Sequence, residues 1–364
     1  MSKLTDISIV LPSLDPDEKL HIVINGLIEQ GFSDIILVND GSKAENLHYF
    51  LEAAEKPQVH LLQHETNRGK GAALKTAFAW FLENRPNGLG VVTVDGDNQH
   101  HPEDTLACAL QMLSTNRIIL GARDFTQDGI PARSKSGNRI TSFVFKIFVG
   151  MTLSDTQTGL RAIPTEYLKT LLTIHGDRFE YETNMLLEMK RCGFPYEEVK
   201  IRTVYIEENK SSHFRAVRDS WRIYKLILAH FFKYTVSSFL SALIDEGIFI
   251  LLTWLLQNTL SGAFLTAVPV IGARIISSMF NFMVNHKVVF QSKSSIGKSL
   301  IRYFSLAIPL LIAQFALTYG LFHLFGISAA QTAIRGVIHA SVMTVLFVFS
   351  YIIQQRWVFQ KKEK

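Results

Sequence analysis

The feature that most constrains this chain is its C-terminal third, which is almost continuously apolar from about residue 234 onwards. Four segments there are each close to the ~20 apolar residues that cross a bilayer: 235–256, 264–284, 303–325 and 334–353. Within a bilayer each segment must satisfy its own backbone polar groups, so the pattern predicts four transmembrane helices in an all-α domain. Residues 1 to about 230 have the composition of a soluble α/β domain, so the mean hydropathy of +0.17 averages over two unlike parts.

The charges in the loops predict how these helices are oriented. The loop after the second segment and the C-terminal end are basic; their cations are Lys287, Lys293, Lys298, Arg302, Arg356, Lys361, Lys362 and Lys364. The other two loops, 257–263 and 326–332, carry no charge. By the positive-inside rule, both termini and the N-terminal domain lie in the cytoplasm of a plasma-membrane protein. Residues 1–6 are polar and lead straight into a predicted strand, so we expect no signal peptide.

The membrane part also repeats itself. NFMVNHKVVFQSK (281–293) aligns with SYIIQQRWVFQKK (350–362), and Phe290 matches Phe359 at an offset of 359 − 290 = 69 residues. The pair Lys233-Tyr234 matches Arg302-Tyr303 at the same offset. We therefore predict two tandem hairpins in the same orientation, a plan that transporters use.

Charged residues inside the spans are costly unless they are paired. Asp245 lies twelve residues from Lys233 and Arg274 thirteen from Lys287, which places both about 18–20 Å deep at ~1.5 Å per residue. We therefore predict an ion pair between Asp245 and Arg274, with Glu246 beside it. A purely structural role and a role in lining a path for lipid headgroups both stay open.

The segment that precedes the first span, 215–233, mixes cations with large apolar residues. The cations are Arg215, Arg218, Arg222, Lys225 and Lys233, and they alternate with residues such as Trp221, Ile223 and Tyr224. This pattern predicts an amphipathic helix on an anionic membrane surface. The alternative is an ordinary surface helix that packs on the soluble domain.

In the soluble part, short apolar runs alternate with helical patterns. We expect strands at 7–11 (ended by Pro12), 34–38, 59–62, 91–94 and 118–120, with helices at 17–29 and 72–82. This alternation predicts a doubly wound, mostly parallel sheet. Polar residues follow the strand ends: Asp40, residues 67–71, Asp95, Asp97 and Arg123. Open sheets of this kind bind ligands at that edge.

Two of these loops have chemistry that suits a nucleoside diphosphate. Asp95 and Asp97 flank a glycine, Gly96, which we expect to let the backbone turn so that both carboxylates converge. Such hard oxygen ligands suit Mg²⁺ or Mn²⁺. The Gly-rich loop 67–71 opens a helix and allows an anion to approach its backbone, although the P-loop spacing is missing. A polar turn and a plain strand-to-helix loop are the alternatives.

The ordered motifs VLPSLDP, VNDGS, NRGKGAAL, VDGDNQHHPED, GARDF, SDTQTGLRAIP and FEYETNM resemble family 2 glycosyltransferases of the Rossmann-like GT-A fold. Within that family, dolichyl- and polyprenyl-phosphate hexose synthases resemble the chain most, over roughly residues 5–225. The resemblance implies nucleotide-sugar binding by Pro12, Asp15, Asp40, Lys70, Asp95 and Asp97, and metal binding by Asp95, Asp97 and Gln99. Asp15 and Pro16 stand where the family usually has Asn and Glu, so base recognition stays open, with Asp17 as a substitute.

A basic series follows the fifth predicted strand: Arg123, Arg133, Lys135 and Arg139. The planar fork of arginine suits phosphate, and the resemblance implies that these residues bind the acceptor phosphate. It also implies that Arg123 and Arg133 are catalytic, together with Asp95 and Asp97. The alternative is a solvated basic loop.

Two further segments belong to the same resemblance. It places the polar segment 155–161 beside the sugar. Glu180 and Glu182 alternate with aromatic residues, so we expect them to point the same way from a short strand or loop. We take them to shape the active site or the acceptor entry, with a structural role as the alternative.

The expected acceptor decides which chemistry is needed. A polyprenyl phosphate is already anionic and attacks the sugar C1 directly, so no general base is required. We therefore expect His100 and His101 to be neighbours of the metal site rather than bases. The resemblance implies inversion, and hence a β-linked product from an α-linked nucleotide sugar.

Residues 233–361 resemble the GtrA-like family, small four-helix proteins thought to help flip polyprenyl-linked sugars. We predict a glycosyltransferase domain at 1–214, an interfacial helix at 215–233 and a GtrA-like domain at 234–364. The predicted function is transfer of a hexose from a UDP- or GDP-hexose to polyprenyl phosphate, which supplies lipid-linked sugar for cell-envelope glycosylation.

Two alternatives remain: a flippase or scaffold that uses the soluble domain as a binder, and a processive polysaccharide synthase. The second is disfavoured because Ile353 stands where the QxxRW motif of such synthases needs Gln, so 354–357 is expected to be a helix end. No nucleic-acid partner is expected, and homo-oligomerisation stays open. Cys108 and Cys192 carry no motif, which predicts buried thiols in a reducing compartment.

Overall fold

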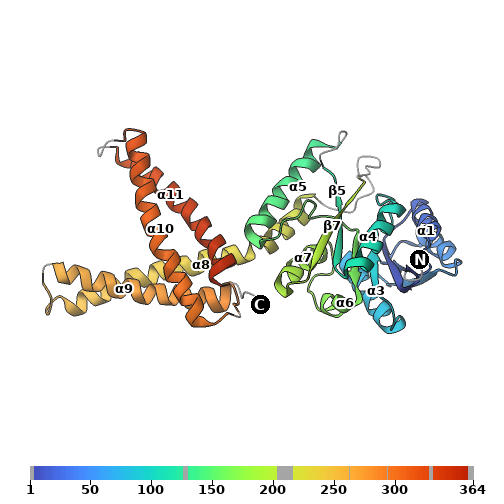
Figure 1. Cartoon of the computed structure of the whole chain (residues 1–364), viewed down its shortest axis with the longest axis horizontal. Coiled ribbons are helices and arrows are strands. Elements are labelled where there is room, and N and C mark those ends of the chain that lie inside the picture. The colour runs from blue at the N-terminus through green and yellow to red at the C-terminus, as the bar shows by residue number, and fades with distance from the viewer. Residues whose placement is uncertain are drawn as a thin grey trace. The chain divides into compact units, whose positions relative to one another are not determined.

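The computed structural model describes residues 4–125, 130–202, 216–261, 263–292, 294–327 and 331–359. Among the residues singled out above, Arg215, Lys293, Lys361, Lys362 and Lys364 lie outside these ranges, as do the side chains of Arg133, Arg218, Trp221, Arg222 and Ile223. The chain divides into two compact units, Met1–Ile227 and Leu228–Lys364, which are described separately. The first is an α/β domain and the second consists of long apolar helices (Figure 1), so the predicted fold class is confirmed.

A seven-stranded sheet forms the middle of the first unit. Its strands are β1 (Ile7–Ser13), β2 (Ile35–Asn39), β3 (Val59–Gln63), β4 (Gly90–Thr93), β5 (Ile118–Arg123), β6 (Arg161–Pro164) and β7 (Tyr196–Ile201). They lie in the order β3-β2-β1-β4-β6-β5-β7. Only β6 runs antiparallel to its neighbours. The 3-2-1-4 half has the order of a mononucleotide-binding Rossmann unit.

Helices cover both faces of this sheet (Figure 1). They are α1 (Lys19–Glu29), α2 (Leu47–Ala54), α3 (Lys70–Asn84), α4 (Pro102–Thr115), α5 (Ala132–Val144), α6 (Thr165–Leu172) and α7 (Glu180–Cys192), with short helical segments at Leu4–Asp6, Ala44–Asn46 and Phe145–Val149. Because the side chains of a strand alternate between faces, Ile36 and Val38 of β2 pack with α3, α6 and α7, whereas Ile35 and Leu37 pack with α1, α2 and α4. Burial on both faces explains why these strands are continuous apolar runs.

Two local expectations are wrong. Pro12 does not end the first strand: β1 continues to Ser13, with Pro12 in register with Val38 of β2, although proline cannot donate to the ladder. The turn after β2 is closed by the Ser42 N–H, which donates to Asn39 Oδ1 on the last residue of β2 at 2.9 Å, and the next helical turn begins at Ala44. The thiols also differ from the expectation.

Cys108, a residue of α4, is buried in the core, but Cys192 is exposed at the end of α7. An exposed thiol at a helix end is reached by solvent, whereas the core thiol is surrounded by apolar side chains. The prediction of buried thiols therefore holds for one cysteine of the two.

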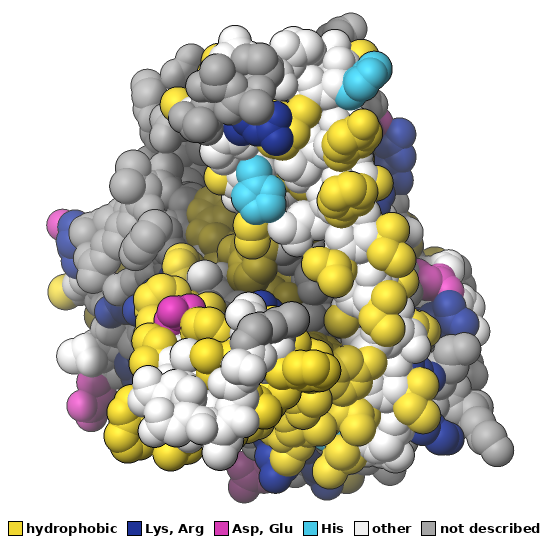
Figure 2. All heavy atoms as spheres, turned by 90° about the vertical axis from the view of Figure 1, so that its left-hand side faces the viewer, with side chains coloured by type: hydrophobic (Ala, Val, Ile, Leu, Met, Phe, Trp, Pro, Cys, Tyr) yellow, Lys and Arg dark blue, Asp and Glu magenta, His cyan; other side chains and the backbone are white. Residues whose placement is uncertain are grey.

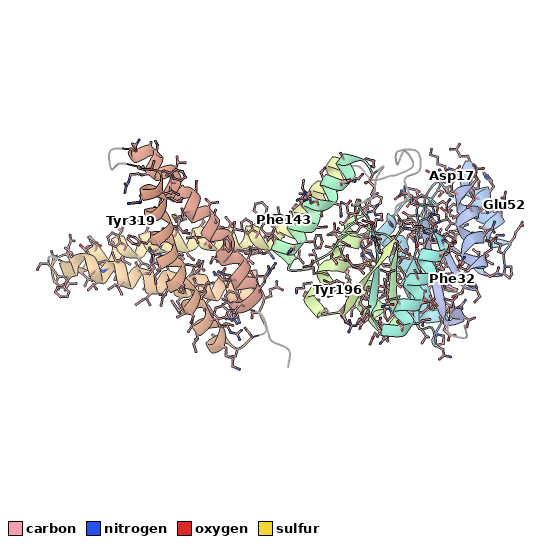
Figure 3. The ribbon with its side chains drawn as sticks, turned by 45° about the horizontal axis from the view of Figure 1, so that its top comes forward. Asp17, Phe32, Glu52, Phe143, Tyr196 and Tyr319 are labelled. Carbon is pink, nitrogen blue, oxygen red and sulfur yellow. The ribbon has the colours of Figure 1, made fainter. Side chains whose placement is uncertain are left out.

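Four long helices form the second unit, of which the first begins in the first unit. They are α8 (Ala216–Leu256), α9 (Ala263–Val284), α10 (Ile296–Leu324) and α11 (Thr332–Ile353), and α9 and α11 continue as π-helical segments, Asn285–Val289 and Gln354–Val358. Among the described residues, four stretches are long and apolar enough to cross a membrane: Phe231–Leu256, Phe264–Val289, Ile296–Leu324 and Ala333–Val358. The chain is therefore a multi-pass membrane protein. Apolar and aromatic side chains point outward from these helices, among them Tyr319 of α10 (Figure 3).

The segment 215–233 does not form a helix separate from the first span. From Ala216 onwards it is continuous with the span in α8. Of its predicted cations, Lys225 and Lys233 are described, and both are exposed. The placement of this segment on a membrane surface stays a prediction.

The predicted repeat is visible as symmetric packing between the hairpins α8–α9 and α10–α11. Asn285 and Gln354, which are 354 − 285 = 69 residues apart, begin the two π-helical segments, and the Asn285 amide donates to Gln354 Oε1 at 3.1 Å. Phe290 stacks on its repeat partner Phe359 with ring centroids 5.0 Å apart. The two tandem hairpins therefore meet through equivalent residues, and residues 354–357 end a helix as expected.

Candidate active site

The carboxyl ends of the parallel strands meet at one edge of the sheet, and predicted site residues gather there. Asp40 follows β2, Asp95 follows β4, and Arg123 is the last residue of β5. Because β6 is antiparallel, its first residue, Arg161, lies in register with Thr93 at this same edge. The edge therefore brings together carboxylates and arginines that are far apart in the sequence, as the strand pattern predicts.

The acidic loop after β4 is turned by an asparagine rather than by its glycine. Asn98 has a φ of +62°, whereas Gly96 has no positive φ and an added Cβ there would make only ordinary contacts. The Gln99 N–H donates to Asp97 Oδ1 at 3.1 Å and holds that carboxylate against the turn. Our expectation that Gly96 allows the turn is therefore wrong, since asparagine also tolerates the left-handed region.

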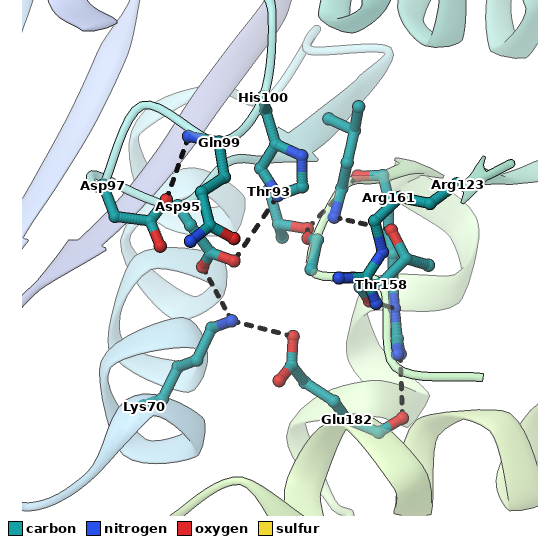
Figure 4. A network of polar contacts seen from close by, with 12 residues as sticks. Lys70, Thr93, Asp95, Asp97, Gln99, His100, Arg123, Thr158, Arg161 and Glu182 are labelled. Atoms are coloured by element: carbon teal, nitrogen blue, oxygen red, sulfur yellow. Dashed lines mark hydrogen bonds and ion pairs between the residues drawn. The ribbon is translucent and has the colours of Figure 1, made fainter. Parts of the chain in front are cut away.

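Lys70, the first residue of α3, joins two carboxylates from distant parts of the chain. Its Nζ lies 2.7 Å from Asp95 Oδ1 and 3.0 Å from Glu182 Oε1 (Figure 4). Burial lowers the pKa of Lys70, but the two carboxylates outweigh burial and hold that pKa above its ordinary value. Lys70 is therefore a firmly charged cation at a helix N-terminus, a position that itself attracts anions.

The two carboxylates of the acidic loop differ in their electrostatic surroundings. His100 is buried and its Nε2 lies 3.4 Å from Asp95 Oδ2. Burial raises the pKa of Asp95, but Lys70 and His100 together bring it well below its usual range. Burial and the charge of Asp95 raise the pKa of Asp97. A further cation between Asp95 and Asp97 would relieve this repulsion.

Asp40 holds the loop that starts α3. Its Oδ2 accepts the Gly69 N–H at 2.7 Å, and its Oδ1 accepts the Arg68 N–H at 3.0 Å and lies 2.7 Å from His64 Nδ1. Position 69 requires glycine, because its φ is +103° and the backbone of Asp177 leaves no room for a Cβ. Asp40 thereby positions the start of α3, where Lys70 lies, and its predicted contact with a base or ribose stays a prediction.

Asp15 joins the loop after β1 to the loop after β2. Its N–H donates to Ser42 Oγ at 2.8 Å, and its Oδ1 accepts the Lys43 N–H at 2.8 Å. Pro12 lies buried three residues earlier, inside β1. Both residues therefore lie beside the edge where the predicted nucleotide-sugar site is, and their contacts with a nucleotide stay predictions.

Arg123 is held by a buried carboxylate. Its Nε donates to Asp155 Oδ2 at 2.7 Å and its Nη2 to Asp155 Oδ1 at 3.2 Å, while the Asp155 side chain is completely buried. The guanidinium also lies over the Phe125 ring, 5.2 Å from its centroid. Arg123 is therefore oriented by its own surroundings before any ligand binds.

The other predicted acceptor residues lie on α5. Lys135 is half-buried and Arg139 is exposed, whereas the side chain of Arg133 lies outside the described residues. On the same helix, the Asn138 amide donates to the Ser154 carbonyl at 2.6 Å. This bond connects α5 to the segment that orients Arg123. Among the described residues, the side chains of the basic series do not contact one another.

Comparison with known families identifies both units. Residues 8–172 match the model of the family described as Glycosyl transferase family 2, and residues 233–359 match that described as GtrA/DPMS, transmembrane domain. The chain thus joins a family 2 glycosyltransferase to a GtrA/DPMS transmembrane domain. The predicted family and its membrane partner are confirmed.

This glycosyltransferase is similar to proteins from archaea and bacteria. It is 28% identical to an uncharacterized protein of Methanocaldococcus jannaschii, over 62% of this chain and 93% of that protein. It is also 28% identical to the UDP-N-acetylglucosamine–dolichyl-phosphate N-acetylglucosaminyltransferase of Methanococcus voltae, over 55% of this chain and 86% of that protein. Among solved structures, the glucosyl-3-phosphoglycerate synthase of Mycobacterium tuberculosis in complex with Mn²⁺, UDP-glucose and phosphoglyceric acid covers 61% of this chain and 78% of its own, with 17% identity and a TM-score of 0.47.

The donor atoms of the acidic loop fit a divalent cation. Within the ranges that the structure describes, no three His, Cys, Asp or Glu side chains converge as metal ligands. The loop instead offers the carboxylates of Asp95 and Asp97 and the amide of Gln99, all hard oxygen donors of the kind that Mg²⁺ and Mn²⁺ take together with water and substrate phosphates. These are the three predicted ligands, and their coordination of a metal stays a prediction.

Sequence reasoning missed the partnership of Lys70 with Glu182. We expected Glu180 and Glu182 to point the same way, which is wrong because α7 begins at Glu180 and residues two apart on a helix point in nearly opposite directions. Glu182 reaches Lys70, whereas Glu180 Oε1 accepts the Arg178 N–H at 3.4 Å. The sequence gives no N-cap signal for a helix start here, because Phe179 stands at the N-cap position and makes no side-chain cap.

Arg161 ends the segment 155–161, which the resemblance places beside the sugar, but its individual contacts were not predicted. It is among the largest fully buried side chains; its Nη1 donates to the Glu182 carbonyl at 2.8 Å and its Nε to the Thr158 carbonyl at 3.2 Å. Its Nη2 has no hydrogen-bond partner in the described part of the chain. Burial lowers the pKa of Arg161, and the nearby carboxylates oppose that change. Its signal in the sequence is an arginine that follows a polar run and begins a short apolar one.

Proposed function

We propose that this glycosyltransferase moves one hexose from a nucleotide sugar to a polyprenyl phosphate at the cytoplasmic face of the membrane. One observation carries the proposal: Asp95 and Asp97 lie at the carboxyl edge of the parallel strands beside a half-buried Lys70, in a chain with four candidate membrane spans among the described residues. The Methanococcus voltae relative supports it, because its name gives a dolichyl-phosphate acceptor. The sugar and the nucleotide base, UDP or GDP, are left to experiment.

On the donor side, the proposal assigns the diphosphate to the acidic loop and to Lys70. A Mg²⁺ or Mn²⁺ ion held by Asp95, Asp97 and Gln99 would neutralise the charge that develops on the leaving diphosphate. The ammonium of Lys70 at the start of α3 stabilises the same charge. The loops that carry Pro12, Asp15 and Asp40 would bind the nucleoside.

On the acceptor side, the proposal uses the basic series. Arg123 would bind the lipid phosphate through the guanidinium that Asp155 orients, and Arg133, Lys135 and Arg139 would add charge from α5. Planar arginine forks bind phosphate oxygens in pairs, which fixes the direction of attack. The proposal gives Arg123 and Arg133 a part in catalysis for this reason.

The proposed reaction needs no proton transfer. An oxygen of the lipid phosphate attacks C1 of the hexose, and the bond from C1 to the diphosphate oxygen breaks with its electron pair remaining on the nucleoside diphosphate. Attack from the opposite side inverts C1 and gives a β-linked hexosyl phosphate. Holding both reactants in line and stabilising charge are the contributions of the enzyme. His100, which is buried against Asp95, has no proton to remove.

The proposal also includes the domain plan. Residues 1–214 would form the catalytic domain, 215–233 an interfacial segment and 234–364 the membrane domain. The cations of the loop after the second span and of the C-terminal end support a cytoplasmic location of both termini under the positive-inside rule. The product would serve as a lipid-linked sugar for glycosylation of the cell envelope.

Donor screening in membranes tests this proposal. Membranes that contain the wild-type chain are incubated with polyprenyl phosphate, Mn²⁺ and a panel of UDP- and GDP-sugars labelled in the sugar. We expect one donor to give label in a lipid that mild acid hydrolyses, because a hexosyl phosphate is acid-labile. The Asp97→Ala variant should lose this label, since it removes one proposed metal ligand.

A matched control makes the screen decisive. The Glu83→Ala variant removes an exposed carboxylate near the C-terminal end of α3, at the other end of the helix from Lys70, and it should keep most of the label. The proposal is refuted if no donor labels the lipid while a water-soluble acceptor is labelled. It also fails if Asp97→Ala transfers label at the wild-type rate.

A further inference from the structure

The α8–α9 hairpin carries charges inside its spans that the proposed function does not use. Arg274 Nη2 lies 3.2 Å from Asp245 Oδ2, which confirms the predicted ion pair, and Ser277 Oγ donates to Asp245 Oδ1 at 2.7 Å. The Arg274 side chain is nevertheless 72% exposed. Most of this guanidinium therefore points out of the unit, toward the surroundings of the hairpin.

Glu246, next to the ion pair, is exposed as well. Among the residues that the structure describes it makes no ion pair. An acidic side chain and most of a guanidinium thus face outward within a span, where each is costly in contact with lipid alone. The face drawn in Figure 2 is mostly hydrophobic, and charged side chains are sparse on it. The hairpin therefore presents one acidic and one basic group on an otherwise apolar surface.

The two outward-facing charges lie at the same depth. Counted from the α8–α9 connection, Glu246 is 256 − 246 = 10 residues from the end of its span, and Arg274 is 274 − 264 = 10 residues from the end of its own. Both are therefore about 15 Å from that end at ~1.5 Å per residue. Two copies with the same orientation are related by an axis along the membrane normal, and such an axis pairs only groups of equal depth.

We propose that this face of the α8–α9 hairpin docks on a second copy of the same chain. Glu246 of each copy would contact Arg274 of the other, since in a two-fold interface residue i meets residue j and j meets i. An arginine has five N–H donors, so Arg274 can keep Asp245 while it binds the glutamate of the second copy. Because the opposite charges lie at the same depth, the face is complementary to the same face of a second copy, and contact with that copy is favoured over contact with lipid.

The rest of the face suits close contact between helices. Along α8, large apolar side chains on the side of Glu246 are exposed at helical spacing: Phe239, Leu243, Ile250 and Trp254. Gly247, beside the glutamate, has open space where a Cβ would lie. Only 6% of the apolar window of α8 is buried within the chain. Small residues at such faces allow helices in membranes to approach closely.

The second hairpin provides a natural control, because the repeat places apolar residues at the equivalent positions. Phe315 corresponds to Glu246 (315 − 246 = 69) and Met343 to Arg274 (343 − 274 = 69). The α10–α11 hairpin therefore has the same architecture without the two charges. The proposal predicts that only the first hairpin docks.

Cysteine cross-linking in native membranes tests the interface. Gly247→Cys and, as the control, its repeat equivalent Ala316→Cys are each placed in a chain with both native cysteines changed to serine. Copper–phenanthroline should convert Gly247→Cys to a covalent dimer at least several times faster than Ala316→Cys. Equal rates for the two positions, or no dimer from either, would overturn the proposed interface.

A charge variant tests the pairing itself. Glu246→Gln in the Gly247→Cys chain should reduce cross-linking, with the dissociation constant in lipid bilayers, measured by photobleaching steps on dilution, rising about tenfold. Phe315→Leu should change neither quantity. Because Glu246 is exposed, the thermal unfolding midpoint of both variants should stay at the wild-type value. An unchanged dissociation constant in Glu246→Gln would refute the pairing.

Discussion

Gly159 offers a sharp test of the active-site geometry. Its carbonyl accepts a hydrogen bond from Thr93 Oγ1 at 2.6 Å, which fixes the backbone against β4. A Cβ added at this position would lie 2.3 Å from Asp95 Oδ2 and 3.1 Å from Lys70 Nζ. The Gly159→Ala variant must therefore displace the Asp95 carboxylate, since the fixed backbone cannot move away.

The size of the displacement follows from contact distances. A carbon and an oxygen that are not bonded approach to about 3.3 Å, so the carboxylate has to move by about 1 Å. A misplacement of about 1 Å costs roughly 100-fold in rate, or about 2.7 kcal/mol in activation free energy. We therefore expect Gly159→Ala to lower the rate of lipid glycosylation about 100-fold.

The assay is the initial rate of lipid-linked product formation by the purified chain, with the donor found in the screen above. Gly96→Ala is the matched control, because a Cβ there lies 3.4 Å from Leu11 Cδ2 and Ser13 Oγ, an ordinary contact within the same acidic loop. It should retain most of the activity, and both variants should unfold near the wild-type temperature. A wild-type rate in Gly159→Ala, or an equal loss in Gly96→Ala, would refute the proposed role of the Asp95 position.

Three further predictions address other parts of the structure. Glu182→Gln removes the charge that binds Lys70 and should raise the KM for the nucleotide sugar about 10- to 100-fold, as expected for a charged hydrogen bond. Glu180→Gln should leave this KM unchanged. Equal changes of KM in the steady-state kinetics of the two variants would contradict the prediction. Burial raises the pKa of Cys108 to about 12, so at pH 8 almost none of this thiol is ionised. Maleimide should therefore label only Cys192 in the native chain, as measured by mass spectrometry. Labelling of both cysteines before unfolding would contradict the fold. Gln354→Leu removes the amide that joins the two hairpins and should lower the thermal unfolding midpoint by a few degrees, and an unchanged midpoint would show that this contact contributes nothing.

Much of the architecture is readable from the sequence because it depends on local patterns. An apolar segment of about 20 residues can cross a bilayer in few ways other than as a helix. The buried strand that precedes Asp95 is a short β-branched run. The 69-residue offset predicts which residues meet between the hairpins, as the Asn285–Gln354 contact shows. The gathering of Asp95 and Arg123 at one edge follows from parallel strands alone.

The remainder depends on contacts between distant segments. The antiparallel insertion of β6, which brings Arg161 to the edge, has no local signal, because its four residues read equally well as part of a loop. The contact of Glu182 with Lys70 depends on where α7 begins and how it packs on α3. Pro12 continues a strand that local rules would end, since the neighbouring strands β2 and β4 hold β1 in place.

The stoichiometry of transfer tests the central claim most directly. The purified wild-type chain is given its nucleotide sugar, a divalent cation and polyprenyl phosphate, and both the released nucleoside diphosphate and the lipid product are quantified by mass spectrometry. We predict one released nucleoside diphosphate per glycosylated lipid formed, a single hexose on each glycosylated lipid, and almost no release when the lipid phosphate is omitted. Lipids that carry several hexoses, or release at the same rate without polyprenyl phosphate, would contradict the account.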